Sequence, residues 1–219
     1  MSDLHGSTPI TSVIIPAFNE ETSIGLVLDN LPQETLKEII VVNNGSTDKT
    51  ACVARKHGAR VVDEPLRGYG AACLKGISEL DEPEIVVFID GDFSDFPEEI
   101  ENLVKPIVEN RADFVLGSRM IFPESRAALL PQARYGNILA VFLVKLFFRY
   151  QFTDLGPFRA IRYQSLKEIS MTDKNFGWTV EMQIKAVKHG LRIMEIPVHY
   201  RKRIGVSKIT GTLSGTFKA

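Results

Sequence analysis

Two aspartates one residue apart, in the segment Asp90-Gly91-Asp92, are the residues of this chain whose type and spacing most directly suggest chemistry. They follow an apolar run, residues 85–89, which reads as a buried strand. Carboxylates this close repel each other and are costly to desolvate unless a cation or a hydrogen-bond network compensates them. Mg²⁺ or Mn²⁺ would do so with few protein ligands, leaving coordination positions for diphosphate oxygens. The segment therefore predicts a metal site at Asp90 and Asp92, with an ordinary polar turn as the alternative.

Two of the nearby carboxyl groups are candidates for a catalytic role. Asp92 is one, because a metal held there would neutralise a departing diphosphate. Asp95 is the other, because a carboxylate at this place could act as a general base. Asp95 also has a structural interpretation, since with Glu98 it has the spacing of a capping box at the start of a helix.

The elements that must position these residues alternate along the first half of the chain. Helical patterns separate five short β-branched or apolar runs that we interpret as strands: residues 12–15, 38–42, 60–62, 85–89 and 114–116. A strand that is apolar throughout is buried on both faces, which indicates a mostly parallel sheet with helices on both sides. The predicted fold class is therefore α/β, and ligands are expected beyond the carboxyl ends of the strands.

Polar segments follow the first and second predicted strands. The first ends in Pro16-Ala17-Phe18-Asn19-Glu20-Glu21 and the second in Asn43-Asn44-Gly45-Ser46-Thr47-Asp48. Helix capping and a glycine turn alone would explain many of these residue types. Neither segment has the glycine pattern of a dinucleotide-binding turn or of a P-loop, so a diphosphate has to be held another way.

Composition limits the possible functions. The 219 residues are 44% hydrophobic, which suits a single domain over residues 1–219. A formal net charge of -1 gives no general attraction to nucleic acid. Cys52 and Cys73 are too few for a disulfide framework, and residues 1–12 lack the pattern of a secretory signal. We therefore expect a cytoplasmic protein with no nucleic-acid partner.

The second half of the chain contains a long apolar helix, predicted over residues 136–149. Its apolar core, residues 138–148, is interrupted only by Lys145 and is well below the ~18 to 20 residues that span a bilayer. It is either a core or homodimer helix, or an interfacial helix at the cytosolic face of a membrane, where nearby Arg134 and Arg149 would suit anionic head groups. A second helix, predicted over residues 178–189, carries Glu181 as another candidate base.

Taken together, these motifs resemble those of the family 2 glycosyltransferases. Further motifs resemble the dolichyl-phosphate mannose synthase and polyprenyl-phosphate sugar transferase branch. Together with the three segments described above, at residues 16–21, 43–48 and 90–92, these motifs cover nearly the whole chain. The further motifs are Leu116-Gly117-Ser118-Arg119, Arg134 with Gly136-Asn137, Asp154 with Gly156 to Arg159, and Arg203-Ile204-Gly205-Val206-Ser207-Lys208.

The resemblance implies a GT-A fold, a nucleotide diphosphate-sugar donor, a metal at Asp90 and Asp92, and inversion at the anomeric carbon. The donor half would be about residues 10–117 and the acceptor half about residues 118–219. The residues implied for the donor are Pro16, Ala17, Phe18, Glu20, Asn44, Asp90, Gly91, Asp92, Arg203 and Lys208. Those implied for the acceptor are Arg119, Arg134 and Asn137.

The chain departs from the family at two of these positions. The family usually carries paired aspartates where this chain has Asn43 and Asn44, and often glutamine where it has Ser94. An asparagine amide offers one acceptor and one donor, which matches the ring N–H and carbonyl of uracil better than guanine. This reasoning favours a UDP-sugar over a GDP-sugar.

The acceptor decides whether a base is needed. A phosphate monoester, with a second pKa of about 6, is already an oxyanion at neutral pH. A glycan or other sugar hydroxyl would need a base such as Asp95 or Glu181. The rival functions are a nucleotidyltransferase, which would want a Gly- and Arg-rich loop after the first strand, and a binding or scaffolding protein with a decayed site.

Overall fold

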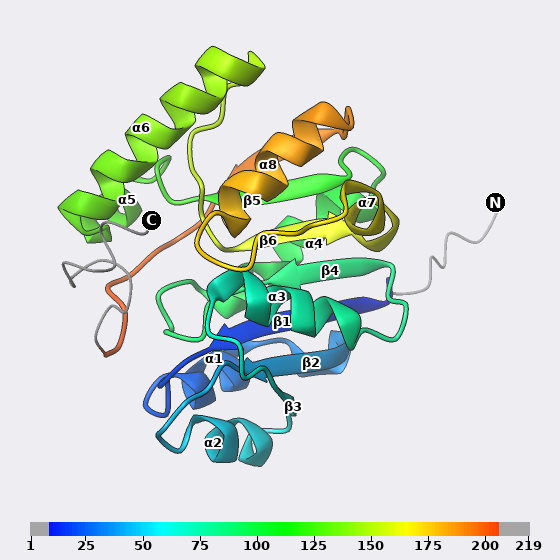
Figure 1. Ribbon diagram of the computed structural model, residues 1–219, viewed down its shortest axis with the longest axis vertical. Coiled ribbons are helices and arrows are strands. Elements are labelled where there is room, and N and C mark those ends of the chain that lie inside the picture. Colours follow the sequence, from blue (N-terminus) through cyan, green and yellow to red (C-terminus); the bar gives the residue numbers. More distant parts are fainter. Residues whose placement is uncertain (1–8, 206–219) are drawn as a thin grey trace, which may run out of the picture.

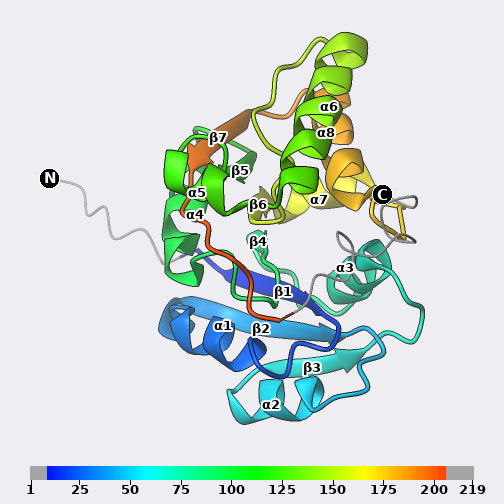
Figure 2. The same cartoon turned by 90° about the vertical axis from the view of Figure 1, so that its left-hand side faces the viewer.

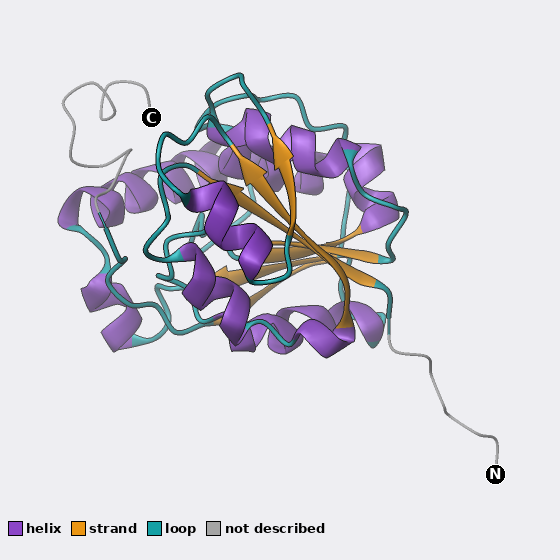
Figure 3. Cartoon of the chain, turned by 90° about the horizontal axis from the view of Figure 1, so that it is seen from below, coloured by secondary structure: helices purple, strands orange, loops and turns teal. Residues whose placement is uncertain are grey.

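The computed structural model describes residues 9–205 and contains one seven-stranded sheet with helices on both faces (Figures 1 and 3). The strands are β1 (Thr11–Ala17), β2 (Leu36–Asn43), β3 (Arg60–Asp63), β4 (Ile85–Phe88), β5 (Phe114–Ser118), β6 (Arg159–Arg162) and β7 (Ile193–Pro197). The α-helices are α1 (Ile24–Asn30), α2 (Thr50–Lys56), α3 (Tyr69–Ser78), α4 (Ile100–Val108), α5 (Pro123–Ala128), α6 (Pro131–Phe148), α7 (Tyr163–Ile169) and α8 (Trp178–Lys188).

The strand order is β3-β2-β1-β4-β6-β5-β7. The pairs β2–β3, β1–β2, β1–β4 and β5–β7 are parallel, and β6 pairs antiparallel with both β4 and β5. Six strands of the described chain therefore run in one direction and β6 runs against them. The carboxyl ends of β1, β2 and β4 meet at one edge, which positions the polar segments that follow them.

Each face of the sheet is covered by its own set of helices. Alternate residues of β1 point to opposite faces, so that Val13 and Ile15 pack with α1, α2 and α4, whereas Ile14 packs with α3, α6, α7 and α8. Figure 3 shows these two helical layers above and below the strands. Burial on both faces explains why the central strands are apolar throughout.

The sequence predictions of a mostly parallel α/β fold and of five strands are confirmed. The strands β6 and β7 were missed. Arginines begin and end β6, and Glu195 lies inside β7, so neither segment has the apolar run that identified the others. The predicted helices at 136–149 and 178–189 correspond to α6 and α8, and α6 begins five residues earlier than predicted.

Helix α6 lies at the outer edge of the molecule beside α8 (Figures 1 and 2). Its buried residues are Asn137 and Val144, while Tyr135 and Phe147 are each 72% exposed. Its exposed apolar surface is made of Tyr135, Ile138, Leu139, Phe142, Leu143, Leu146 and Phe147. Within residues 9–205, no helix combines the length and apolar character needed to cross a bilayer.

Candidate active site

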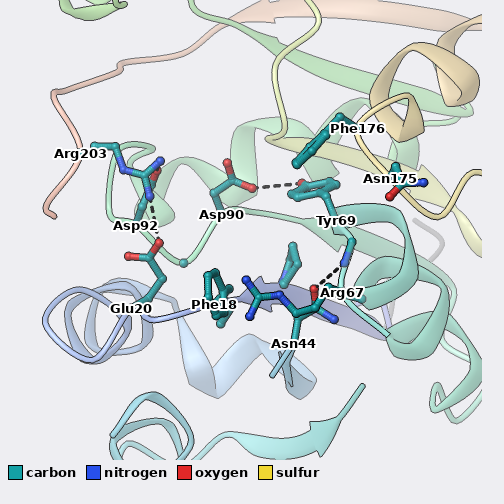
Figure 4. A pocket seen from close by; sticks show the side chains of 15 residues that line it. Phe18, Glu20, Asn44, Arg67, Tyr69, Asp90, Asp92, Asn175, Phe176 and Arg203 are labelled. Carbon is teal, nitrogen blue, oxygen red and sulfur yellow. Dashed lines mark hydrogen bonds and ion pairs between the residues drawn. The ribbon is translucent and has the colours of Figure 1, made fainter. Parts of the chain in front are cut away.

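A cavity of about 300 Å³ opens where β1, β2 and β4 end (Figure 4). It brings together every predicted donor residue that the structure describes: Pro16, Ala17, Phe18, Glu20, Asn44, Asp90, Gly91, Asp92 and Arg203. Lys208 lies outside the described residues. Phe176, which the sequence suggested as part of an acceptor wall with Gly177 and Trp178, also lines the cavity. Five further lining residues were not singled out from the sequence: Arg67, Gly68, Tyr69, Ala72 and Asn175.

Asp90 is held by a tyrosine on one side of the cavity (Figure 4). The hydroxyl of Tyr69 donates a hydrogen bond to Asp90 Oδ1 at 3.0 Å. Burial and the neighbouring charge of Asp92 raise the pKa of Asp90 from 3.8 to about 7, against the opposing effects of Tyr69 and Arg203. Two carboxylates in this arrangement therefore resist carrying full charge together, as their spacing predicted.

Arg203 is a cation placed between two carboxylates of the cavity. Its Nη2 lies 2.9 Å from Glu20 Oε1, and its Nη1 lies 3.3 Å from Asp92 Oδ2. The other oxygen of Asp92 accepts hydrogen bonds from the backbone N–H and the hydroxyl of Ser94, at 2.9 and 2.5 Å. Asp92 is thus oriented on both sides, and Arg203 adds positive charge at the edge where a diphosphate would bring negative charge.

The residues present fit a divalent metal held by few protein ligands. Asp90 and Asp92 offer hard oxygen ligands, and a cation between them would offset the burial and the charge of Asp92 that together raise the pKa of Asp90. No cluster of three or more His, Cys, Asp or Glu side chains suited to a metal occurs in residues 9–205. Water and substrate oxygens would have to complete the coordination, which is the usual pattern for Mg²⁺ at phosphate sites.

The prediction that Asn44 reads the nucleobase is wrong in this structure. Its Nδ2 donates to the backbone carbonyls of Glu64 and Leu66 at 3.0 and 2.7 Å, and its Oδ1 accepts the Gly68 N–H at 2.9 Å. Both N–H donors of the amide and one lone pair of its oxygen are therefore used by the 64–68 loop. Asn44 lines the cavity, and its amide stabilises the 64–68 loop, which forms part of the cavity wall.

That wall carries Arg67, whose guanidinium carbon lies 3.3 Å from the centre of the Phe18 ring (Figure 4). Arg67 also donates to the carbonyl of Gly45 at 3.2 Å. Both Arg67 and Tyr69 follow β3, at the same sheet edge as the other site segments. The signal that could have identified them is the Arg67-Gly68-Tyr69-Gly70 segment itself, a polar and glycine-rich stretch that follows a predicted strand.

Asp95 is buried but does not line the cavity. Neither of its carboxylate oxygens has a hydrogen-bond partner among the described residues, so the capping-box interpretation is wrong. Burial and then the charge of Asp90 raise the pKa of Asp95 well above its usual value, although Arg119 opposes the shift. Because Asp95 does not line the cavity, it is not placed to take a proton from an acceptor bound there, which argues against Asp95 as a general base.

Two of the three predicted acceptor residues, Arg119 and Asn137, are linked through the 153–155 loop. Arg119 Nε and Nη2 each lie 2.8 Å from a carboxylate oxygen of fully buried Asp154. Asn137, on α6, donates to the carbonyl of Thr153 and accepts from the N–H of Leu155. The Asn137 amide is therefore committed to structure, which corrects its assignment as a direct acceptor ligand. Arg134, on the same helix, is exposed to solvent.

Glu181 is also a correction. Its carboxylate accepts hydrogen bonds from the N–H groups of Thr172 and Asp173 and pairs with Lys185 at 2.8 Å. It supports the loop before α8 and does not line the cavity, which argues against Glu181 as the base. Phe176, from the same loop, does line the cavity.

Comparison with known proteins agrees with this geometry. A family model described as glycosyl transferase family 2 matches residues 12–170. The chain is 33% identical over 205 residues to the dolichyl-phosphate hexose transferase of Haloferax volcanii, covering 90% of this chain and 86% of that protein. It is 28% identical over 209 residues to the UDP-N-acetylglucosamine--dolichyl-phosphate N-acetylglucosaminyltransferase of Methanococcus voltae, covering 85% and 83% of the two chains.

Among solved structures, the fold resembles glucosyl-3-phosphoglycerate synthase from Mycobacterium tuberculosis in complex with Mn²⁺, UDP-glucose and phosphoglyceric acid. The TM-score is 0.74 at 25% identity, covering 91% of this chain and 73% of that one. This likeness confirms the predicted GT-A type of fold.

Proposed function

The chain belongs to glycosyl transferase family 2, and we propose that it is an inverting enzyme that moves a sugar from a UDP-sugar to a lipid-linked phosphate of the polyprenyl or dolichyl class. The observation that carries the proposal is the cavity itself. It gathers two acidic residues suited to a metal, a stacked arginine–phenylalanine pair and Arg203 at the carboxyl edge of a parallel sheet.

The amide of Asn44 binds the 64–68 loop, so it gives no support for a uracil base. Support for the UDP-sugar comes from the relatives instead. UDP-glucose is named in the complex of the mycobacterial synthase, and the Methanococcus voltae enzyme is named for a UDP-sugar. The ring of Phe18 offers an aromatic surface in the cavity, and Arg67 on that ring is a cation next to it. A nucleoside there would stack near Phe18 and Arg67, with its diphosphate directed toward Arg203.

The leaving group needs positive charge, which the chain's own residues would provide in part. Arg203 lies beside Asp92 and can turn one of its N–H groups to a diphosphate oxygen. Tyr69 holds Asp90 in place, and Ser94 orients Asp92. A divalent metal bound by Asp90 and Asp92 would supply further neutralisation of the departing diphosphate.

Support for a phosphate acceptor comes from the two carboxyl groups considered as bases. Asp95 is buried and does not line the cavity, and Glu181 is engaged by the 172–173 backbone. A phosphate monoester needs neither, because it is already an oxyanion at neutral pH. Its negative charge needs cations, and Arg134 at the start of α6 is an exposed one. The names of both dolichyl-phosphate relatives favour the same acceptor class.

The exposed face of α6 supports a lipid surface as the place where the acceptor is met. Tyr135, Leu139, Phe142 and Leu146 lie on it at spacings of three to four residues and are 58–72% exposed. From residue 125 to residue 153 the chain has no acidic side chain, while Arg126, Arg134, Lys145 and Arg149 are basic. An apolar surface flanked by basic residues suits an anionic membrane, which attracts those residues. A second copy of the same face would bring basic residues against basic residues.

The direct test is sugar transfer to a polyprenyl phosphate in anionic vesicles, with UDP-sugars and Mn²⁺ supplied. Labelled sugar should appear in the lipid fraction, and GDP-sugars should serve poorly. Transfer to a free glycan but not to lipid phosphate would replace the proposed acceptor with a sugar hydroxyl. No transfer and no donor hydrolysis with any nucleotide sugar would contradict the proposed activity.

The surface is tested by vesicle flotation of the Phe142→Glu variant, with Val108→Glu as the matched control. Val108 is a similarly exposed apolar residue on α4, on the opposite helical layer. Only Phe142→Glu should lose binding to anionic vesicles. If wild type floats equally well with neutral vesicles, the basic residues do not contribute. Loss of a dimer on the Phe142→Glu change, with no vesicle binding by wild type, would assign the face to a second copy.

A further inference from the structure

Arg201 holds the loop that follows Asp92 from outside the cavity. Its guanidinium carbon lies 3.6 Å from the centre of the Phe93 ring and 4.0 Å from that of Phe96. Its Nε donates to the carbonyl of Phe93 at 2.9 Å, and its Nη2 donates to the carbonyl of Asp95 at 3.2 Å. One side chain thus stacks on two rings of the loop and also binds two of its carbonyl groups.

The loop has a backbone conformation that needs such support. Phe93 has a φ of 59°, in the left-handed region that a bulky side chain rarely occupies. The turn at Phe93 lies directly between Asp92, which faces the cavity, and Ser94, which hydrogen-bonds the Asp92 carboxylate. A change of backbone at Phe93 would therefore move the Asp92 side chain relative to Asp90.

The backbone beside Arg201 reinforces the same loop. The N–H of Arg201 donates to the carbonyl of Ser94 at 2.9 Å, and the N–H of Ile204 donates to the carbonyl of Asp92 at 3.1 Å. Asp95 and Tyr200 form an antiparallel bridge. Segments 92–95 and 200–204, more than 100 residues apart in the sequence, therefore lie side by side, and the second segment also carries Arg203 to Asp92.

We propose that Arg201 is a positioning residue that fixes the 92–95 loop in its metal-binding form, so that Asp92 is presented to the metal and Arg203 to the diphosphate. This inference rests on the proposed function, since it assigns a purpose to Arg201 within the same donor site. Arg201 does not line the cavity and touches neither Asp90 nor the space for the donor. It acts through the loop alone.

Three variants separate this role from a general loss of stability. Arg201→Ala removes both the stacking and the two hydrogen bonds, while Arg201→Lys keeps a cation but loses the planar fork. Lys202→Ala is the matched control, because Lys202 is the next residue along the same segment and is exposed. Guanidinium ion, added at millimolar concentration to Arg201→Ala, can re-enter the space between the two rings, with potassium chloride as the ionic-strength control.

The first measurement is hydrogen exchange of the metal-free protein in EDTA. Arg201→Ala should lose amide protection in peptides covering residues 92–96 and 200–204 and keep it elsewhere, and guanidinium should restore it. The second is the affinity for Mn²⁺ in the presence of UDP, measured by calorimetry. Arg201→Ala should weaken it by about tenfold or more, with Arg201→Lys between Ala and wild type and Lys202→Ala unchanged.

The outcomes distinguish the two levels of the proposal. Wild-type exchange and wild-type Mn²⁺ affinity in Arg201→Ala would overturn the positioning role while leaving the proposed function intact. Weakened Mn²⁺ binding together with a loss of amide protection across the whole protein that guanidinium does not reverse would also overturn it. Such a result would indicate a general structural role for Arg201. If the wild type binds no Mn²⁺ with UDP, the proposed function fails, and local, guanidinium-reversible loss of protection still establishes the clamp on the loop.

Discussion

Replacing Asp90 by asparagine is expected to make the metal-free protein more stable at pH 8 and unable to gain stability from Mn²⁺ and UDP. The substitution keeps the size of the side chain and an oxygen that can accept the Tyr69 hydroxyl. What it removes is the carboxylate charge next to Asp92, which burial and that neighbour disfavour.

The magnitude follows from the pKa of Asp90, which is raised from 3.8 to about 7 in the folded protein. Because the folded-state pKa of Asp90 is raised, its contribution to the stability of the folded protein is fully present below pH 3.8. That contribution is lost as the pH rises through 7 and Asp90 ionises. At 1.36 kcal/mol per pKa unit, the full shift corresponds to about 4 kcal/mol. Asp90 is only partly buried in an open cavity, and solvent screening reduces this to about 1 to 2 kcal/mol. Such a gain raises Tm by about 2 to 8 °C for a chain of this size.

Thermal unfolding in EDTA between pH 5 and pH 8.5 measures the effect, with Mn²⁺ and UDP added in a parallel series. The difference in Tm between Asp90→Asn and wild type should grow with pH, because wild type loses stability as Asp90 ionises. Added Mn²⁺ and UDP should raise the Tm of wild type, most at high pH, and should leave Asp90→Asn nearly unchanged. A variant that is less stable at every pH, or one that retains the Mn²⁺ response, would refute the account of this carboxylate.

Three further predictions concern other residues of the site. Asp92→Ala should abolish Mn²⁺-dependent UDP binding with a native circular dichroism spectrum, and undiminished binding by calorimetry would exclude Asp92 as a metal ligand. Arg134→Ala should slow transfer to lipid phosphate by one to two decades, since a charge-assisted contact contributes roughly 1.5 to 3 kcal/mol. Hydrolysis of the donor should stay at the wild-type rate, and a parallel fall in both rates would assign Arg134 to the donor site. Asn44→Ala should lower the unfolding free energy in urea by about 1 to 3 kcal/mol, because it leaves backbone groups of the 64–68 loop unpaired. The ratio of UDP to GDP affinity should not change, and a shifted ratio would show that Asn44 reads the base after all.

The sequence by itself determined the sheet and the edge at which the site lies. Buried parallel strands must be apolar on both faces, so the first five strands could be recognised from short apolar runs. Polar residues that follow such runs meet at one edge whatever the details of packing, which is why Asp90, Asp92 and Glu20 could be placed together in advance. The antiparallel strand β6 could not be found in this way, because its inward-facing Arg159 is satisfied by backbone carbonyls that only the fold brings near.

Only the tertiary structure decided what each polar side chain of that edge does. Asparagine, glutamate and arginine can bind a ligand or bind the protein's own backbone, and the choice depends on which groups lie within about 3 Å. Asn44 and Glu181 satisfy loops, Asp95 is buried without a partner among the described residues, and Arg119 is paired with Asp154. Arg201 reaches a loop more than 100 positions earlier in the chain, where it stacks on two rings. Residue type is a local property, but a hydrogen-bond partner is supplied by chain folding, so sequence located the site and tertiary contacts distributed its roles.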